Sequence, residues 1–323
     1  MSQTTRSLLR SVASYLPDRV LTNDELSKTL DTSDSWIRER TGIAQRHVAA
    51  EGELTSDLAT NAAREALRRA GVQVGAVDLI IVATATPDHT FPATATAVMR
   101  KLGVGPCMAF DVQAVCAGFA YALMLADSLI RTRQVHLAVV IGAETFSRIL
   151  DWKDRGTCVL FGDGAGAVVL TADSASDDAG ILACTASADG RYYDELYVDG
   201  GPSSTGTAGH LRMNGREVFR HAVGRLAGAA SEVLQQAGLT IADVDWLVPH
   251  QANIRIIEAV GKRLGLADGK TVVTVERHGN TSAASIPLAL DTACSDGRIG
   301  NGDLVLMNAM GGGFAWGAVL ARM

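Results

Sequence analysis

Residues 63–72 read AREALRRAGV, and residues 230–239 read ASEVLQQAGL, at an offset of 167 residues (230 − 63). Alanine, glutamate, leucine and glycine recur at matching places in the two segments. The apolar spacing predicts an amphipathic helix in each copy, and Gly71 and Gly238 are typical residues for the C-terminal end of a helix. A repeat of this length predicts two similar structural units in one chain.

The residues that follow each copy keep the same register. Val77-Asp78 stands at the same offset as Val244-Asp245, and an apolar run follows each pair, LIIVATATP from residue 79 and WLVP from residue 246. Continuous apolar runs of this kind are typical of strands in a sheet that is covered on both faces. Both halves therefore read as helix, glycine stop, aspartate and buried strand.

The two halves are also expected to end alike. TCVLFGDGAGAVVL at 157–170 and LVLMNAMGGGFAWGAVL at 304–320 each predict a strand, a glycine turn and a second strand. The alternative, a chance likeness of two alanine-rich helices, does not account for the matching flanks. We therefore expect an α/β chain of two duplicated halves, residues 1–172 and 173–323.

Composition sets broad limits on what the chain does. Hydrophobic residues make up 47% and charged residues 20% of its 323 residues, which is enough apolar material for a large core and excludes a disordered chain. The net charge of −6 argues against a protein that binds nucleic acid or anionic membranes. The longest uncharged apolar stretch, residues 115–126, is shorter than a bilayer requires, and the first 19 residues lack the apolar core of a secretory signal.

The five cysteines, at positions 107, 116, 158, 184 and 294, are odd in number, widely spaced and without a CxxC pair. This pattern predicts neither a disulfide framework nor a zinc site, and it favours a reduced, cytoplasmic chain.

One cysteine stands apart from the others. In AFDVQAVCAGFAYALMLADSLI, residues 109–130, a short strand leads to Cys116 and an almost wholly apolar helix follows. A helix that is apolar all round lies in the middle of a protein. Cys116 would therefore stand at a helix N-terminus, where free N–H groups stabilise a thiolate. The simpler interpretation, a small buried hydrophobe, fits the other four cysteines better than this one.

A nucleophilic cysteine needs polar partners, and two segments offer them. His250 follows the buried strand WLVP, at the strand end where sites form in α/β sheets. His278 is a second histidine, in ERHGNTSAASIPLAL beside Asn280. At the repeat offset Cys116 corresponds to Ala283, so Asn280 would lie at the turn that mirrors the nucleophile's turn. A purely structural histidine is the alternative at both positions.

The glycine cluster GDGAG at 162–166 is not a dinucleotide-binding loop, because the strand-like AVVL follows it where a helix N-terminus is needed. The sequence also lacks a GxSxG elbow, a P-loop and an HExxH metal motif.

Four motifs, in this order and spacing, closely resemble the β-ketoacyl-acyl carrier protein synthase III family: DVQAVCAGF at 111–119, VPHQANIRII at 248–257, RHGNTSAASIPLAL at 277–290 and GGGFAWG at 311–317. The resemblance runs essentially from end to end of the chain. It implies a thiolase-like fold, in which two α/β halves form five α-β-α-β-α layers. It also implies the first condensation of type II fatty acid synthesis, between an acyl-CoA primer and a malonyl-acyl carrier protein.

Carried over residue by residue, the resemblance makes Cys116 the acylated nucleophile and His250 and Asn280 the pair that promotes decarboxylation. The backbone N–H groups of Cys116 and Gly312 would form the oxyanion hole. No metal and no resident cofactor is implied, because acyl-CoA is a substrate.

The resemblance also assigns the substrate-binding residues. Trp36 and Arg155 would enclose the coenzyme A adenine, while the rest of the coenzyme A path would be lined by Thr32, Arg40, Gly215 and Asn253. Phe91, Met213 and Met310 would shape the acyl pocket, Phe91 being lent by the partner subunit of a homodimer. Carrier docking would fall to Arg220, Arg255, Lys262 and Arg263, three of which lie on or beside the outer face of the helix expected after His250.

Met310 departs from the family pattern, because an aromatic residue usually precedes the glycine run there. A papain-like hydrolase also pairs Cys with His and Asn, but its nucleophile needs an open cleft, whereas an apolar helix and glycine walls are expected around Cys116. A thiolase needs a second reactive cysteine, a hydroxymethylglutaryl-CoA synthase a glutamate base, and an elongating synthase two histidines. A non-catalytic binding module would be marked by the loss of Cys116, His250 or Asn280, and all three are present. A specialised acyltransferase or condensing enzyme of secondary metabolism remains the alternative, since product analysis alone separates it.

Overall fold

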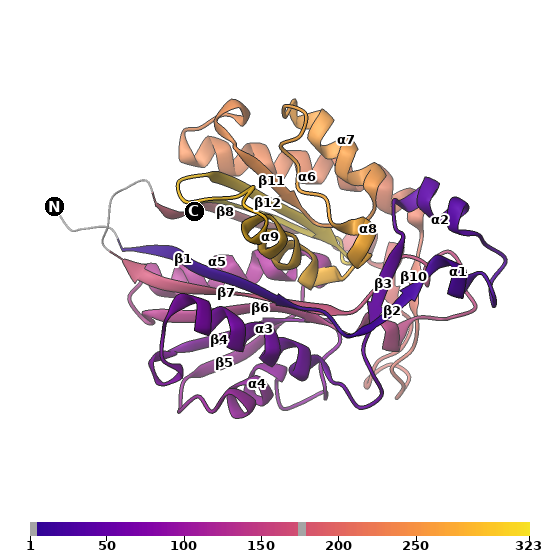
Figure 1. Ribbon diagram of the computed structural model, residues 1–323, viewed down its shortest axis with the longest axis horizontal. Helices are drawn as coiled ribbons and strands as arrows, with labels where there is room; N and C mark the ends of the chain where they lie inside the picture. Colours follow the sequence, from indigo (N-terminus) through magenta and orange to yellow (C-terminus); the bar gives the residue numbers. More distant parts are fainter. Residues whose placement is uncertain (1–4, 174–178) are drawn as a thin grey trace.

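The computed structural model describes residues 5–173 and 179–323, and its two largest sheets lie one above the other (Figure 1). The first sheet has five strands in the order β1-β7-β6-β4-β5, which are β1 (Arg6–Tyr15), β7 (Gly164–Asp173), β6 (Leu137–Glu144), β4 (Leu79–Ala83) and β5 (Met108–Val112). The second has four in the order β11-β12-β13-β8, which are β11 (Trp246–Pro249), β12 (Leu304–Gly311), β13 (Ala315–Arg322) and β8 (Gly180–Ala188).

Helices form the other three layers of the molecule (Figure 1). The outer face of the first sheet is covered by α3 (Thr55–Ala70) and α4 (Thr94–Leu102). Between the sheets lie α5 (Gly118–Arg131) and α9 (Ser285–Ser295), and the second sheet is covered by α6 (Gly215–Ala237) and α7 (Ile254–Leu264). The chain therefore has the five-layered, duplicated α/β thiolase-like architecture that the sequence predicted.

The repeated helices end as their glycines predicted. Gly71 after α3 and Gly238 after α6 both adopt the left-handed conformation, with φ of 66° and 69°. The central layer is apolar as expected, because Phe119, Leu123 and Ile130 of α5 are fully buried between the sheets. The packing of this layer holds the N-termini of α5 and α9 in place, and residues predicted for the functional site lie just before these N-termini.

The prediction of a strand, a glycine turn and a strand at 157–170 is wrong for its first part. Residues 157–160 form a turn, and the glycines Gly164 and Gly166 lie inside β7. A Cβ atom at Gly166 would stand 2.6 Å from Cβ of Pro287, so this glycine permits α9 to pack closely on the sheet. The corresponding prediction for 304–320 is confirmed by β12 and β13.

A smaller group of elements gathers at one end of the two sheets (Figure 1). It consists of β2 (Arg19–Thr22), α1 (Asn23–Leu26), α2 (Asp34–Thr41), β3 (Gln45–Val48), β9 (Leu196–Val198), β10 (Leu211–Met213) and α8 (Val275–His278). Buried apolar residues including Ile37, Phe146 and Phe161 hold this group together.

Two segments on which the sequence made a prediction lie partly outside the described residues. They are residues 1–4, from the first 19 residues in which no secretory signal is expected, and residues 174–178, just after the expected boundary between the halves. Within the first segment, Arg6–Tyr15 form strand β1. In the part of the chain that the structure describes, no helix is long and apolar enough to cross a membrane.

Candidate active site

Cys116 lies at a tight elbow between β5 and α5. It occupies the short helical turn Val115–Ala117, and its own exposed fraction is 3%. Gly311, at the end of β12, approaches the elbow so closely that a Cβ atom there would stand 2.7 Å from the Cys116 backbone nitrogen. The glycine run of the second half therefore forms a wall beside the nucleophile.

Burial dominates the acidity of the thiol. Desolvation raises the pKa of Cys116 to about 12, and the negative charge of nearby Glu144 acts in the same direction, while the Ser282 hydroxyl opposes both. The resting thiol is therefore neutral at pH 7. The stabilising effect of a helix N-terminus on a thiolate, which the sequence predicts, therefore acts against the cost of burying the charge.

His250 stands at the end of β11 and is also buried, with 4% of its surface exposed. Its backbone N–H donates to the Asn308 carbonyl (2.8 Å), and its Nδ1 lies 2.6 Å from the Ser285 hydroxyl at the beginning of α9. Burial lowers the pKa of His250 to about 3, so the imidazole is neutral at pH 7. A neutral imidazole donates a hydrogen bond from one ring nitrogen and accepts one at the other.

Asn280 lies in the segment between α8 and α9. Its backbone pairs with the turn before β7, since its N–H donates to the Leu160 carbonyl at 2.9 Å. Its side-chain Oδ1 accepts a hydrogen bond from the Ser282 backbone N–H at 2.9 Å. Because the oxygen is held in this way, the amide NH₂ group is the part of the side chain that is free to donate to a ligand.

The three residues line one cavity of about 280 Å³. Cys116 comes from the first half of the chain, and His250 and Asn280 come from two segments of the second half. Further walls come from residues predicted for the coenzyme A path, the acyl pocket and the carrier patch: Arg40, Met213, Gly215, Asn253, Arg255 and Met310. The second histidine considered, His278, is buried at the end of α8 and is not among the lining residues.

The remaining residues predicted for coenzyme A lie beside this cavity, around α2. Two guanidinium groups lie close to the Trp36 ring, with the Arg40 carbon Cζ 4.4 Å and the Arg155 carbon Cζ 5.3 Å from its centroid. Arg155 also forms an ion pair with Asp31 at 2.9 Å. The neighbouring Thr32 hydroxyl is buried without a hydrogen-bond partner among the described residues.

Phe91 lies apart from the cavity of its own subunit. Its side chain is 83% exposed and does not belong to the lining residues. Gly312, the second predicted oxyanion donor, follows Gly311 at the wall beside Cys116, and a Cβ atom there would stand 2.5 Å from the Leu196 carbonyl oxygen.

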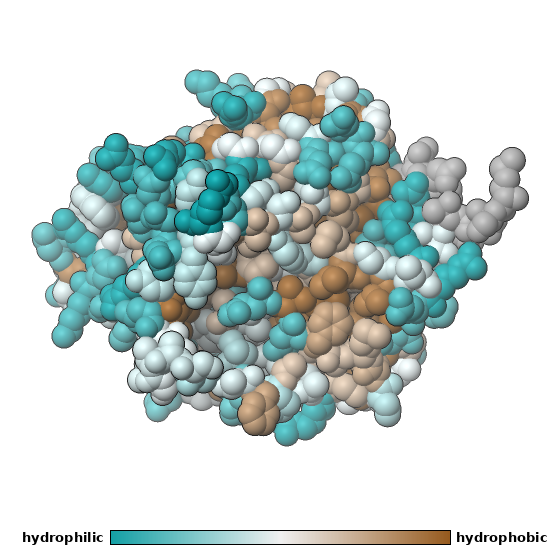
Figure 2. Space-filling view, turned by 180° about the vertical axis from the view of Figure 1, so that it is seen from behind, coloured by the Kyte–Doolittle hydropathy of each residue, from teal (hydrophilic) through white to brown (hydrophobic). Residues whose placement is uncertain are grey.

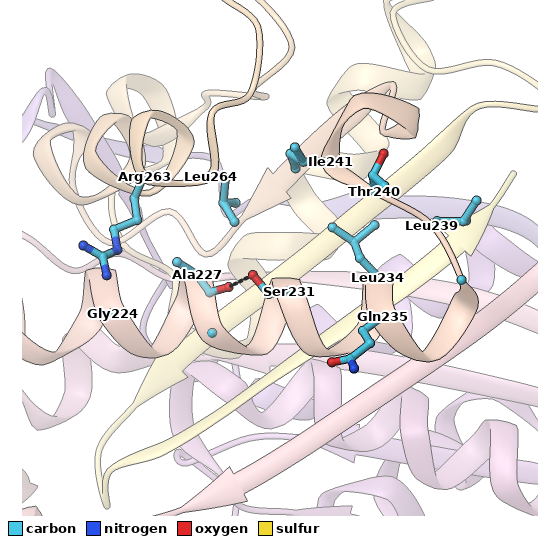
Figure 3. A pocket seen from close by; sticks show the side chains of 12 residues that line it. Gly224, Ala227, Ser231, Leu234, Gln235, Leu239, Thr240, Ile241, Arg263 and Leu264 are labelled. Carbon is cyan, nitrogen blue, oxygen red and sulfur yellow. Dashed lines mark hydrogen bonds between the residues drawn. The ribbon is translucent and has the colours of Figure 1, made fainter.

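The four predicted docking cations are exposed along α6 and α7. Arg255 lines the cavity and donates to the Glu39 carbonyl, whereas Arg220 is ion-paired with Glu217. Arg263 belongs to a second, open groove of about 670 Å³ between α6 and α7, where its guanidinium extends toward Gly224 (Figure 3). Three of the cations thus lie on α7 and Arg220 lies on α6, and Arg255 is the one that lines the cavity.

Several residues of the site carry no motif that could reveal them. Phe161 and Leu196 line the cavity, and Glu144 lies buried behind Cys116, where it accepts hydrogen bonds from Thr86 Oγ1 (2.6 Å) and the Ala85 backbone N–H. Burial raises the pKa of Glu144 to about 7. In the sequence, Glu144 is recognisable only as the last residue of an apolar run, and that position is a weak signal for a functional site.

Comparisons with known proteins agree on one family. The family model described as 3-oxoacyl-[acyl-carrier-protein] synthase III matches residues 110–190, and the model for the C terminal part of the same enzyme matches residues 234–323. The β-ketoacyl-[acyl-carrier-protein] synthase III of Paramagnetospirillum magneticum is 63% identical, over 98% of this chain and 99% of its own.

Solved structures show the same fold. The 3-oxoacyl-[acyl-carrier-protein] synthase III of Aquifex aeolicus is 47% identical, with a TM-score of 0.93 over 98% of this chain and 100% of its own. The priming β-ketosynthase of the R1128 polyketide pathway also reaches a TM-score of 0.93, at 33% identity over 100% of this chain and 98% of its own. With a cysteine, a histidine and an asparagine gathered in one cavity, the chain belongs to the β-ketoacyl-acyl carrier protein synthase III family of acyltransferases.

Proposed function

We propose that the protein condenses a short acyl-CoA primer, acetyl-CoA being the first choice, with malonyl-acyl carrier protein. The products are a 3-oxoacyl-acyl carrier protein, CO₂ and coenzyme A. The convergence of Cys116, His250 and Asn280 on one cavity is the main observation in support. The reaction would begin type II fatty acid synthesis.

In the first half-reaction, Cys116 Sγ attacks the carbonyl carbon of the acyl-CoA. The oxyanion that forms would be held by the backbone N–H groups of Cys116 and Gly312. The carbon–sulfur bond to coenzyme A then breaks, and the thiol proton lost by Cys116 leaves with the coenzyme A sulfur. One thioester replaces another, so the step requires little free energy.

In the second half-reaction, the malonyl group loses CO₂ and its electron pair passes into an enolate. His250 Nε2–H and the Asn280 NH₂ group would donate to the enolate oxygen, and the carbanion would attack the carbonyl carbon of the acyl group on Cys116. The bond from that carbon to Cys116 Sγ then breaks, and the departing thiolate takes up a proton from solvent to restore the thiol. Because the departing CO₂ generates the carbanion, no strong base is required. The neutral His250 fits this role, since a donor rather than a proton acceptor is needed. We therefore propose that the reaction uses no metal and no resident cofactor.

Coenzyme A would lie over α2 and the beginnings of α6 and α7. The Trp36 ring would stack on the adenine, and the guanidinium of Arg155, whose Cζ lies 5.3 Å from the ring centroid, would cover the other face of the adenine. Arg40, Gly215 and Asn253 line the cavity and would accompany the pantetheine arm to Cys116, with Thr32 beside them.

The acyl end of the cavity supports a short primer. Phe161 lines the cavity and is backed by Phe146, with ring centroids 5.0 Å apart and nearly parallel planes. Two stacked and buried aromatic rings leave little space for a long chain. Met213 and Met310 also line the cavity and would shape the acyl pocket, and the flexible Met310 in place of an aromatic ring would affect acyl breadth more than the type of reaction.

We propose a homodimer that joins β5 to β5 of a second copy. In the described sheet β5 is an edge strand paired with β4 alone, and its Met108 is 42% exposed. An open edge with apolar side chains is typical of a strand that pairs with another chain. Apolar residues also gather in one broad patch on the face shown in Figure 2. The exposed Phe91 would then enter the partner's acyl pocket.

The exposed cations Arg220, Arg255, Lys262 and Arg263 would receive the acidic carrier protein at the cavity. We place the protein in the cytoplasm, where its five unpaired cysteines would stay reduced. We also propose that residues 1–172 and 173–323 are the duplicated units, since the first contributes the five-stranded sheet and the second the four-stranded one.

The proposal is tested with purified protein, acetyl-CoA and malonyl-carrier. We expect an acetyl adduct on Cys116 by mass spectrometry and a 3-oxoacyl-carrier product accompanied by CO₂. Acyl transfer to another acceptor without CO₂ would favour the alternative, a specialised acyltransferase of secondary metabolism. The similarity to the priming β-ketosynthase of a polyketide pathway is the observation that favours testing this alternative.

A further inference from the structure

The Ser285 hydroxyl is the one side-chain group that contacts the ring of His250 at hydrogen-bond distance among the described residues. The two atoms, Ser285 Oγ and His250 Nδ1, lie 2.6 Å apart, and both side chains are buried. The backbone N–H of Gln251 also donates to the same hydroxyl oxygen, at 3.3 Å. Ser285 thus stands where β11 ends and α9 begins, behind the catalytic cavity.

Donor and acceptor balance decides how these groups are arranged. Gln251 N–H is a donor, so the hydroxyl oxygen accepts from it. The hydroxyl proton then needs an acceptor, and His250 Nδ1 is the acceptor within reach among the described residues. If Nδ1 carried a proton instead, the hydroxyl would accept twice, and its own proton would be buried without a partner, which is unfavourable.

The groups around Ser285 are held firmly. The Gln251 side chain is buried and donates to the carbonyls of Pro249 (2.8 Å) and Val272 (3.1 Å), while its oxygen accepts from the Thr274 backbone N–H (2.8 Å). Every polar atom of this amide is therefore used, so the backbone N–H of Gln251 cannot turn away from Ser285 without breaking these bonds. The direction of the Ser285 hydroxyl is fixed as a consequence.

We propose that Ser285 is a positioning residue, which donates its hydroxyl proton to His250 Nδ1 and so fixes the tautomer with the proton on Nε2. This inference rests on the proposed role of His250 as a donor to the enolate oxygen. The Nε2 atom makes no hydrogen bond to the described residues, and His250 lines the cavity. The N–H needed for decarboxylation therefore points to the substrate before the substrate arrives.

Loss of the Ser285 hydroxyl is expected to separate the two half-reactions. Acylation of Cys116 uses backbone N–H groups and does not need a particular tautomer. Decarboxylation needs the Nε2–H donor. Without a fixed partner on Nδ1, the neutral His250 ring would exist as a mixture of two tautomers or would rotate, so that fewer molecules would present an Nε2–H to the substrate. We expect CO₂ release to fall by about tenfold or more in Ser285→Ala, with acylation nearly unchanged.

The direct test is ¹⁵N NMR of the full-length protein labelled at its histidine ring nitrogens, at pH 7. The His250 signals are assigned by their loss in His250→Gln. We expect Nε2 protonated and Nδ1 unprotonated in the parent and in Ser285→Thr, which keeps the hydroxyl, and a mixed or reversed pattern in Ser285→Ala. Thr292→Val removes a hydroxyl from the same helix, where it bonds to the Leu288 carbonyl, and should leave the His250 pattern as it is.

Kinetics complete the test, with CO₂ release from malonyl-carrier and acylation of Cys116 measured on the same samples. A parent protein that carries the His250 proton on Nδ1, or a Ser285→Ala variant that keeps the Nε2–H tautomer, would overturn the inference whatever the activity. A changed tautomer with full CO₂ release would overturn its catalytic consequence. If His250→Ala itself released CO₂ normally, the fault would instead lie in the proposed role of His250.

Discussion

Val115 and Ser282 adopt the same left-handed backbone angle, with φ of 48° in each, and stand 167 residues apart (282 − 115), which is the offset of the sequence repeat. Each precedes a helix of the central layer, Val115 before α5 and Ser282 before α9. Left-handed angles cost energy in residues with a Cβ atom, so both halves keep the same strained elbow. One elbow presents Cys116, and the other holds Asn280 through the Ser282 backbone N–H.

Replacing Ser282 with glycine should release this strain. Glycine adopts positive φ without a steric cost, so we expect Ser282→Gly to raise the free energy of unfolding by about 1 kcal/mol. The looser elbow should hold Asn280 less well and slow condensation. Ser282→Ala is the matched control, because it loses the hydroxyl and keeps the Cβ atom. Urea unfolding that found glycine no more stable than alanine would show that the elbow is unstrained.

Glu144→Gln should change how stability depends on pH. Burial raises the pKa of Glu144 from its ordinary 4.5 to about 7, so between these values the folded chain binds a proton that the unfolded chain does not. Stability from this group is therefore complete below pH 4.5 and is lost as pH rises through 7, by on the order of 3 kcal/mol.

The variant should lose that decline, so its stability relative to the parent should improve from pH 5 to pH 8 in denaturant unfolding. The lowered pKa of His250 acts in the opposite direction below pH 6.5, but parent and variant share it, so it cancels in the difference. Glu276→Gln, at an exposed position, controls for the loss of a charge. Parallel pH curves for parent and Glu144→Gln would contradict the raised pKa.

Arg255→Glu should weaken use of the carrier protein. Arg255 is exposed at the cavity, so a charge reversal there should raise KM for malonyl-carrier several-fold and make the remaining activity less sensitive to salt. Acylation by acyl-CoA should change less. Arg64→Glu, on α3 at the other side of the molecule, is the matched control. Equal carrier kinetics in the two variants would remove Arg255 from the docking surface.

Phe91→Thr should lengthen the preferred primer. If the partner subunit places Phe91 in the acyl pocket, the smaller side chain admits further CH₂ groups, each worth about 0.8 kcal/mol once it has space. The measurement is acylation of Cys116 by a series of straight-chain acyl-CoAs, with Leu54→Thr as a control at another exposed apolar position. An unchanged chain-length profile would place Phe91 outside the pocket.

The repeat and the motifs predicted most of the architecture, because helix ends, buried strands and the elbow at Cys116 depend on local residue patterns. The prediction placed GDGAG in a turn, but Gly164 and Gly166 lie in β7, where Gly166 makes room for Pro287, a residue more than a hundred positions away in the sequence. The raised pKa of the Cys116 thiol could not be predicted from the sequence either, since desolvation depends on residues from distant segments that meet around the sulfur. Ser285 and Glu144 could not be found from sequence for the same reason: their partners meet only in the folded chain.

The central claim is that acylation and decarboxylation use different groups of one site. Cys116→Ala should lose the acyl adduct and condensation while retaining slow decarboxylation, and His250→Ala should lose more decarboxylation than acylation. Asn280→Ala is the most direct measurement, because the Asn280 amide is assigned to the enolate oxygen alone. With acylation followed by mass spectrometry and CO₂ release followed from labelled malonyl-carrier, this variant should form the acyl-enzyme normally and lose decarboxylation by about 10²-fold. Equal loss of both activities in Asn280→Ala would contradict the account.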